Sequence, residues 1–153
     1  MEYELWAKSL RELVREVPWP VANMANAAAF IFETVGRLNW AGFYRTERTA
    51  AGEPLLVLGP FQGRPACIEI PWGRGVCGTA AAQDRPLKVD DVHEFPGHIA
   101  CDAASASEVV VPLHNAAGEV IGVLDLDSPE PARFTDEDFA GLIDFARVIE
   151  EWI

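Results

Sequence analysis

Residues 108–127 read EVVVPLHNAAGEVIGVLDLD, which is two apolar runs around a short polar segment. The runs at 108–113 and 120–127 are rich in valine and leucine, residues that favour β-strands. Between them, residues 114–118 supply asparagine and glycine, which favour turns. The stretch therefore predicts a β-hairpin, and it is the starting point for the rest of the fold.

Toward the N-terminus, further short apolar runs predict more strands, and helical periodicity predicts the first segments. Strand candidates lie at 40–44, 55–61, 66–70 and 86–89. A glycine turn at 73–75 leads into an alanine-rich run to residue 82 that predicts a short helix. Helices are also expected over about 3–38, interrupted by Pro18 and Pro20, and after Thr135, where Asp138 completes an N-cap pattern. Helices that bracket a run of strands predict a single α+β domain over 1–153, with a central antiparallel β-sheet and helices packed on it.

The charge balance limits the partners. The chain has 153 residues, with 12 Lys and Arg against 24 Asp and Glu, so its formal net charge is −12. A phosphate backbone or an anionic membrane surface would be repelled, so neither nucleic acid nor membrane binding is expected. No run approaches the roughly 18 apolar residues of a membrane span, and the N-terminal segment is amphipathic rather than signal-like, so we expect a cytoplasmic protein.

Three cysteines, Cys67, Cys77 and Cys101, leave three interpretations open. They can be small core residues, redox thiols, or, with His98, a Cys₃His zinc site. No C-x-x-C pair is present. Cys101 lies in the stretch 90–107, which has neither helical nor strand periodicity, and a long irregular loop in a compact domain is usually functional. An accessible thiol there suits a redox nucleophile. His93 and His98 are either bases or solvated bystanders.

Acidic and aromatic side chains suggest a pocket on one face of the sheet. Asp125 and Asp127 are two residues apart on a predicted strand and so share a face. With Glu108 on the neighbouring strand, three convergent carboxylates would raise at least one pKa and provide a proton donor. A frayed strand end is the simpler alternative for the two aspartates. Trp40 and Tyr44 also share a face, which fits a pocket wall or ordinary core packing.

Three segments taken together resemble a known family. They are LGPFQGRPACIEIPWGRGVCGTAAA, DVHEFPGHIACDAASASEVVVPL and GEVIGVLDLDSP. They strongly resemble the free methionine-(R)-sulfoxide reductases, which are built on the GAF fold, and the match includes all three cysteine positions. The resemblance implies a single GAF domain that reduces free methionine-(R)-sulfoxide, with the loop 90–107 acting as a lid over the active site.

The resemblance also implies roles for individual residues. Cys101 is similar to the nucleophile, Cys67 to the main resolving cysteine, and Cys77 to a less certain partner. Acids corresponding to Glu108, Asp125 and Asp127 hold the sulfoxide and the amino group in the family, with residues corresponding to Trp40 and Tyr44 around the methyl end.

Partners follow from the same resemblance. It implies a homodimer without metal or cofactor, which receives electrons from thioredoxin and ultimately from NADPH. A non-catalytic GAF sensor domain for a small molecule is the main alternative, and a Cys₃His zinc protein is a weaker one.

Overall fold

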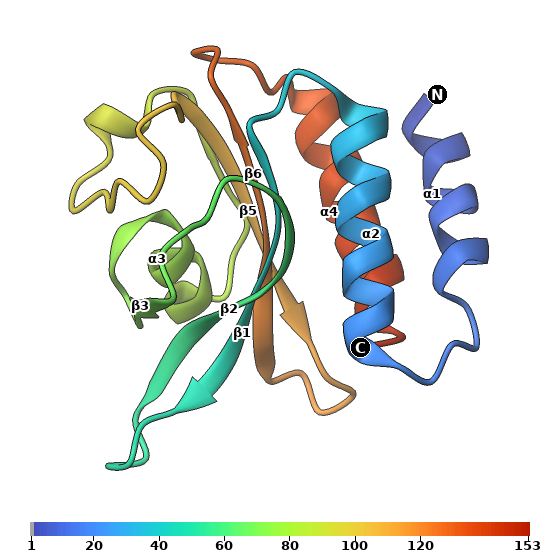
Figure 1. Ribbon diagram of the computed structural model, residues 1–153, viewed down its shortest axis with the longest axis horizontal. Helices are drawn as coiled ribbons and strands as arrows, with labels where there is room; N and C mark the ends of the chain where they lie inside the picture. Colours follow the sequence, from blue (N-terminus) through green and yellow to red (C-terminus); the bar gives the residue numbers. More distant parts are fainter. Residues whose placement is uncertain (1) are drawn as a thin grey trace.

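The computed structural model describes residues 2–153, which form helices and strands in the order shown in Figure 1. In chain order the elements are α1 (Glu2–Val14), α2 (Pro20–Val35), β1 (Trp40–Arg48), β2 (Pro54–Gly63), β3 (Glu69–Pro71), α3 (Gly75–Gln83), β4 (Leu87–Val89), the 3₁₀ helix η1 (Val92–Glu94), β5 (Ser107–His114), β6 (Val120–Ser128) and α4 (Asp136–Glu150). None of these helices is long and apolar enough to cross a membrane.

The strands form one antiparallel sheet in the order β3-β2-β1-β6-β5-β4. Strands β5 and β6 pair as the predicted hairpin, with Glu108 opposite Asp127 and Val110 opposite Asp125. Helices α2 and α4 lie on one face with α1 packed outside them, and α3 lies on the other face with the 90–106 segment (Figure 1). The predicted α+β class with a central antiparallel sheet is confirmed.

Strand alternation divides the central strands between two environments. Toward α2 and α4, β1 and β6 present apolar side chains such as Phe43, Leu124 and Leu126, all fully buried. Toward α3, the same strands present Trp40 and Tyr44, which belong to a second buried cluster, together with the two aspartates. The helix-facing side is therefore the main core, and the α3 side is left to carry polar groups.

Several predicted elements have different ends in the structure: the strands expected at 40–44 and 55–61 extend to Arg48 and Gly63. The strand expected at 66–70 is shorter, because only Glu69–Pro71 pairs with β2, and Cys67 lies in the connection between β2 and β3. Before Glu69, one backbone hydrogen bond joins this segment to β2, from Leu58 N–H to the carbonyl oxygen of Ile68 at 2.8 Å. The second helix stops at Val35 rather than near residue 38, because Gly36 takes a left-handed φ of 72°.

The final helix begins as the N-cap pattern predicts. Thr135 and Asp138 form a capping box, and Asp138 also accepts hydrogen bonds from Tyr3 Oη at 2.7 Å and Arg133 Nη1 at 3.1 Å. Burial alone would raise the pKa of Asp138, but the hydrogen bonds from Thr135 and Tyr3 and the charge of Arg133 hold it below its usual value. One carboxylate thus connects α1, the segment before α4, and α4 itself.

Replacing Asp138 by asparagine is expected to lower the free energy of unfolding by about 1–2 kcal/mol at pH 7. Because the folded pKa is depressed, the wild-type advantage is fully present above the ordinary value of 3.8 and is lost as the pH falls through the lower folded value. Urea unfolding of both proteins at decreasing pH measures this. Asp144→Asn, an exposed change in the same helix, is the control, and a difference that stayed constant with pH would contradict the role of the charge.

Candidate active site

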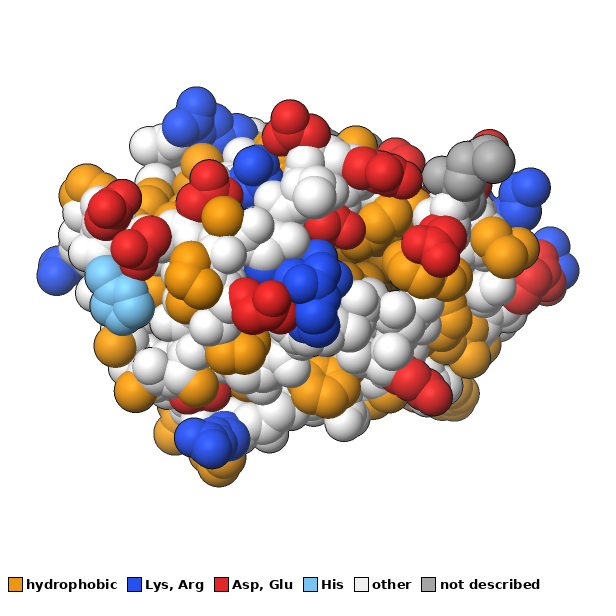
Figure 2. Space-filling view, turned by 90° about the horizontal axis from the view of Figure 1, so that it is seen from above, with side chains coloured by type: hydrophobic (Ala, Val, Ile, Leu, Met, Phe, Trp, Pro, Cys, Tyr) orange, Lys and Arg blue, Asp and Glu red, His pale blue; other side chains and the backbone are white. Residues whose placement is uncertain are grey.

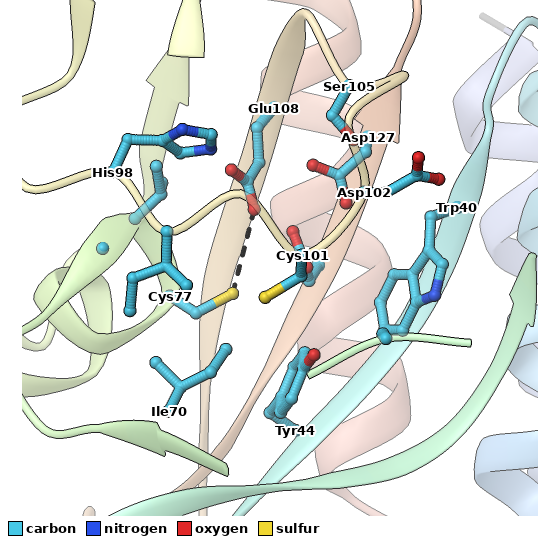
Figure 3. Close-up of a pocket in the computed structure, with 15 residues that line it drawn as sticks. Trp40, Tyr44, Ile70, Cys77, His98, Cys101, Asp102, Ser105, Glu108 and Asp127 are labelled. Carbon is cyan, nitrogen blue, oxygen red and sulfur yellow. Dashed lines mark hydrogen bonds between the residues drawn. The ribbon is translucent and has the colours of Figure 1, made fainter. Parts of the chain in front are cut away.

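A pocket lies on the sheet face that α3 and the 90–106 segment cover (Figure 3). Its walls come from β1, β5, β6, α3 and the loop that carries Cys101. The cavity has a volume of about 40 Å³, which is room for about three water molecules. Every site residue expected from the sequence except Cys67 lines this pocket, and Cys67 is bonded to one that does: the lining includes Trp40, Tyr44, Cys77, Cys101, Glu108, Asp125 and Asp127.

The three acids converge because β5 and β6 pair in a fixed register. Glu108 lies opposite Asp127, and Asp125 lies two residues before Asp127 on the same face of β6. Their exposed fractions are only 6%, 4% and 8% for Glu108, Asp125 and Asp127. Strand β6 continues to Ser128, so the frayed strand end considered for the aspartates is wrong.

Burial and mutual repulsion shift the acids toward their neutral forms. Burial is the largest cause of a raised pKa in Glu108 and Asp127, and the charge of Asp125 adds to it in both. Burial also raises the pKa of Asp125, but hydrogen bonds from Glu108 and Cys77 work in the opposite direction. The trio therefore favours one carboxylate, Asp125, surrounded by groups that retain their protons.

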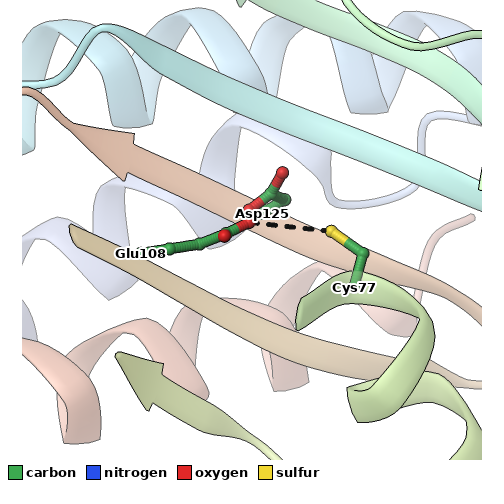
Figure 4. Close-up of side chains that lie close together, drawn as sticks. All are labelled: Cys77, Glu108 and Asp125. Carbon is green, nitrogen blue, oxygen red and sulfur yellow. Dashed lines mark hydrogen bonds between the residues drawn. The ribbon is translucent and has the colours of Figure 1, made fainter. Parts of the chain in front are cut away.

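Cys77 contacts this acid trio from the first turn of α3. Its Sγ lies 3.8 Å from Glu108 Oε2, and Figure 4 shows the thiol, Glu108 and Asp125 close together. Burial raises the pKa of the Cys77 thiol, and Asp125 and Glu108 raise it further. A thiol that keeps its proton is a poor nucleophile.

The other two cysteines form a disulfide, Cys67–Cys101, with Cα atoms 5.2 Å apart. Tyr44 Oη donates a hydrogen bond of 2.9 Å to the carbonyl oxygen of Cys67. Both cysteines are partly exposed, whereas Cys77 is buried. Cys67 and Cys101 are thus the pair that fits the redox interpretation, and they lie at the edge of the acid-lined pocket.

A Cys₃His zinc site is not assembled. Two of its thiols are consumed by the disulfide, and the metal-donor group found within residues 2–153 is instead Cys77, Glu108 and Asp125. His98 lines the pocket, and burial and the neighbouring His93 lower its pKa. His93 is exposed and lies 2.8 Å from Asp91 Oδ1, outside the pocket lining.

Aromatic rings form a stacked wall opposite the acids. Trp40 stacks on Tyr44 with ring centroids 5.8 Å apart, and on Phe61 at 5.1 Å. Within residues 2–153, Trp40 Nε1 and Asp125 Oδ1 are buried without hydrogen-bond partners. Other buried polar atoms also lack partners, but Asp125 Oδ1 belongs to a carboxylate that lines the pocket and is available there to a polar ligand. Phe61 was missed in the sequence because it lies in an otherwise unremarkable apolar run.

Asn39 is a second residue that the sequence did not single out. Its Nδ2 donates to Asp102 Oδ2 and to Ser105 Oγ, both at 3.0 Å, and its backbone N–H donates to the carbonyl oxygen of Asp127. It therefore anchors the loop next to Cys101 to the start of β1. An asparagine before a strand reads as an ordinary turn residue, so no sequence signal identified it.

Acidic side chains outside the pocket are spread over the surface. On the face shown in Figure 2 they alternate with Lys and Arg side chains, and no basic patch gathers there.

An antiparallel sheet with a helical layer on one face and a ligand pocket under a short helix and loop on the other defines a GAF domain, and the GAF domain family matches residues 7–151. Among its relatives, the free methionine-R-sulfoxide reductase of Escherichia coli is 51% identical over 131 residues, which are 86% of this chain and 76% of that protein. The chain belongs to the free methionine-R-sulfoxide reductase family of GAF-domain proteins.

Solved structures support the assignment of the chain to this family. The free methionine-R-sulfoxide reductase of Neisseria meningitidis in complex with its substrate matches with a TM-score of 0.89 and 42% identity, covering 97% of this chain and 86% of that one. The reduced form of the Staphylococcus aureus enzyme matches with a TM-score of 0.91 and 43% identity, covering 98% and 94%.

Proposed function

We infer that this protein reduces free methionine-R-sulfoxide to methionine by thiol chemistry. The observation that carries the inference is the Cys67–Cys101 disulfide at the edge of a pocket lined by three buried acids. The names of its relatives support the same reaction. A non-catalytic sensor domain would need neither the redox pair nor the acid trio.

In the proposed reaction, the Cys101 thiolate attacks the sulfoxide sulfur while Glu108 gives a proton to the sulfoxide oxygen. The oxygen then moves from the substrate sulfur to Cys101 Sγ: the substrate S–O bond and the S–S bond made by the attack both break, an Sγ–O bond forms, methionine leaves, and Cys101 becomes a sulfenic acid. Glu108 suits this role because burial keeps its proton in place near neutral pH. Sulfur of the substrate is reduced by two electrons and the cysteine is oxidised by two.

Recognition of the free amino acid is assigned to the same pocket. An ammonium group would be attracted by the Asp125 carboxylate, whose Oδ1 is unpartnered, and by Asp127 beside it. A methionine sulfoxide residue inside a protein has no such ammonium, so the acids select the free compound. Trp40 and Tyr44 supply the apolar wall for the methyl end.

Cys67 completes the cycle as the proposed resolving cysteine. Its thiol displaces water from the Cys101 sulfenic acid, which gives the Cys67–Cys101 disulfide, and an external dithiol protein reduces that bond. We propose thioredoxin, supplied with electrons by NADPH, as the reductant, and no further metal or cofactor takes part. The disulfide state leaves a cavity of only about 40 Å³, so substrate enters after reduction, when the 90–106 segment can move.

A homodimer is proposed as the assembly. Apolar side chains on the helical side of the molecule support it, because Leu5, Trp19 and Val21 are 65%, 68% and 60% exposed. A cytoplasmic location remains an expectation from the sequence and from the redox chemistry.

The proposed function predicts epimer selectivity. With thioredoxin, thioredoxin reductase and NADPH present, free methionine-R-sulfoxide is expected to support steady NADPH oxidation, while the S epimer supports at least about 100-fold less, because a displaced sulfoxide oxygen misses the proton donor. Repeating the assay with dithiothreitol in place of thioredoxin tests whether the sulfoxide is reduced, independently of which protein supplies the electrons. Turnover of the S epimer alone, or binding of either epimer without any methionine release, would refute the assignment.

A further inference from the structure

A second cavity lies on the opposite face of the sheet from the disulfide. Its volume is about 210 Å³, and it is formed where the start of α2, the turn after β5 and Ile153 meet the sheet. Figure 1 shows these three parts at the same end of the molecule. The sheet itself separates this cavity from the acid-lined pocket, with β1 as a shared wall.

The interior of the second cavity is apolar. Met24, Phe43 and Leu113 form its buried wall, and the half-buried Ile121 lies nearer the surface. Gly122 occupies the helix-facing row of β6 and contributes no side chain to fill the space. An apolar cavity of about 150 Å³ is large enough to hold benzene, so this one has room for roughly six to eight carbon atoms.

The mouth of the cavity is polar and cationic. Arg45 and Asn115 line it and are both exposed. Within residues 2–153, the Arg45 side chain makes no hydrogen bond or ion pair, whereas the Arg48 side chain on the same strand donates to the carbonyl oxygen of Gly52 at 3.0 Å. The chain carries a net charge of −12, and among its cationic side chains Arg45 is the one that lines this cavity within residues 2–153. A guanidinium is well suited to bind a carboxylate.

We propose that this second cavity binds a small amphiphilic carboxylate, with its hydrocarbon part among Met24, Phe43 and Leu113 and its carboxylate on Arg45. The two halves of the site match the two halves of such a ligand: an apolar interior of limited length and a single cationic group at the opening. The proposed binding residues are distinct from the thiol site, because none of Met24, Phe43, Leu113 and Arg45 lines the acid-lined pocket; Tyr44 lines both cavities.

Octanoate and 1-octanol are the probes that test the proposal, because they differ in the carboxylate. Titration calorimetry is expected to give saturable octanoate binding, with 1-octanol about tenfold weaker. Arg45→Gln should weaken octanoate about tenfold and leave 1-octanol unchanged. Arg48→Gln removes the same charge from the same strand outside the cavity and should change neither.

The location is tested by filling the cavity and by a local probe. Ile121→Trp places a large ring at the cavity opening and should prevent binding of both compounds. The chain contains two methionines, Met1 and Met24, so methyl-labelled methionine gives an NMR signal at the cavity wall that octanoate should shift. Reduction of methionine-R-sulfoxide by Arg45→Gln and Ile121→Trp should equal that of the wild type, which shows that both variants are folded.

Three results would overturn the proposal. They are the absence of saturable octanoate binding up to about 10 mM, equal weakening by Arg45→Gln and Arg48→Gln, and competition between octanoate and methionine for one site. The last result would place octanoate in the acid-lined pocket instead.

Discussion

Replacing Cys101 by serine is expected to abolish reduction of free methionine-R-sulfoxide, with kcat falling at least about 10⁴-fold. A serine hydroxyl keeps the size of the side chain but is a much weaker nucleophile, and it can form neither a sulfenic acid nor a disulfide. The buried acids remain in place, so the variant should still bind the substrate. Rapid mixing of the reduced protein with the R epimer, followed by quantification of methionine, measures the loss.

The matched variant is Cys67→Ser, which removes the other half of the disulfide. It should release about one methionine per protein molecule and then stop under thioredoxin, because the sulfenic acid on Cys101 has no partner thiol. A sulfenic-acid trapping reagent should label Cys101 in this variant and leave Cys101→Ser unlabelled. Steady turnover by Cys101→Ser would rule out the mechanism, and steady turnover by Cys67→Ser would transfer the resolving role to Cys77.

The gathering of the acid trio was predictable in part, because the two aspartates and the neighbouring strand follow local rules. Two aspartates two residues apart share a face of a strand, and a short turn forces the next strand to lie beside it. Glu108 meets Asp127 across the β5–β6 pair only because the register shifts between Leu113 and His114; without that shift Glu108 would pair with Leu126, on the other face. The N-cap at Thr135 was predictable for the same reason, since all its atoms lie within four residues.

The residues that the sequence did not reveal depend on contacts between distant segments. Asn39 anchors Asp102 and Ser105, which are 63 and 66 residues away, and nothing in its neighbourhood signals this. Phe61 reaches Trp40 only because β1 and β2 pair with a register shift between Gly42 and Tyr44. The strand predicted at 66–70 was too long for a related reason. The apolar pattern there suits a strand, but the chain turns to bring Cys67 to Cys101. Such long-range requirements override local preference.

The family resemblance and the structure contribute different things. The quoted segments indicate the chemistry, but residue spacing alone left zinc binding, core packing and redox activity open for the cysteines. The structure separates them by environment: Cys77 is buried against two carboxylates, and the other two thiols share a bond near the surface. The alternatives were therefore settled by burial and pairing, which the sequence does not encode locally.

Replacing Glu108 by glutamine is expected to lower kcat/KM for methionine-R-sulfoxide by about 10²- to 10⁴-fold, the usual contribution of a positioned proton donor. Glutamine keeps the shape of the side chain and can hydrogen-bond the sulfoxide oxygen, but it cannot transfer a proton. Burial and the charge of Asp125 raise the pKa of Glu108. The wild-type donor is therefore protonated near neutral pH and loses its proton as the pH rises through this raised pKa. The chemical step should therefore slow on the alkaline side.

The pH profile distinguishes proton donation from a merely structural role. Wild-type kcat/KM should decline at high pH, whereas the profile of Glu108→Gln should lack that decline, because the variant has no proton to lose at this position. Glu47→Gln, an exposed change on β1, is the control and should keep both the rate and the profile of the wild type. Asp127→Asn tests the other protonated acid of the trio. If Asp127→Asn flattened the alkaline side and Glu108→Gln did not, the proton would come from β6 rather than β5, and Glu108 would serve only to keep Asp125 oriented toward the substrate.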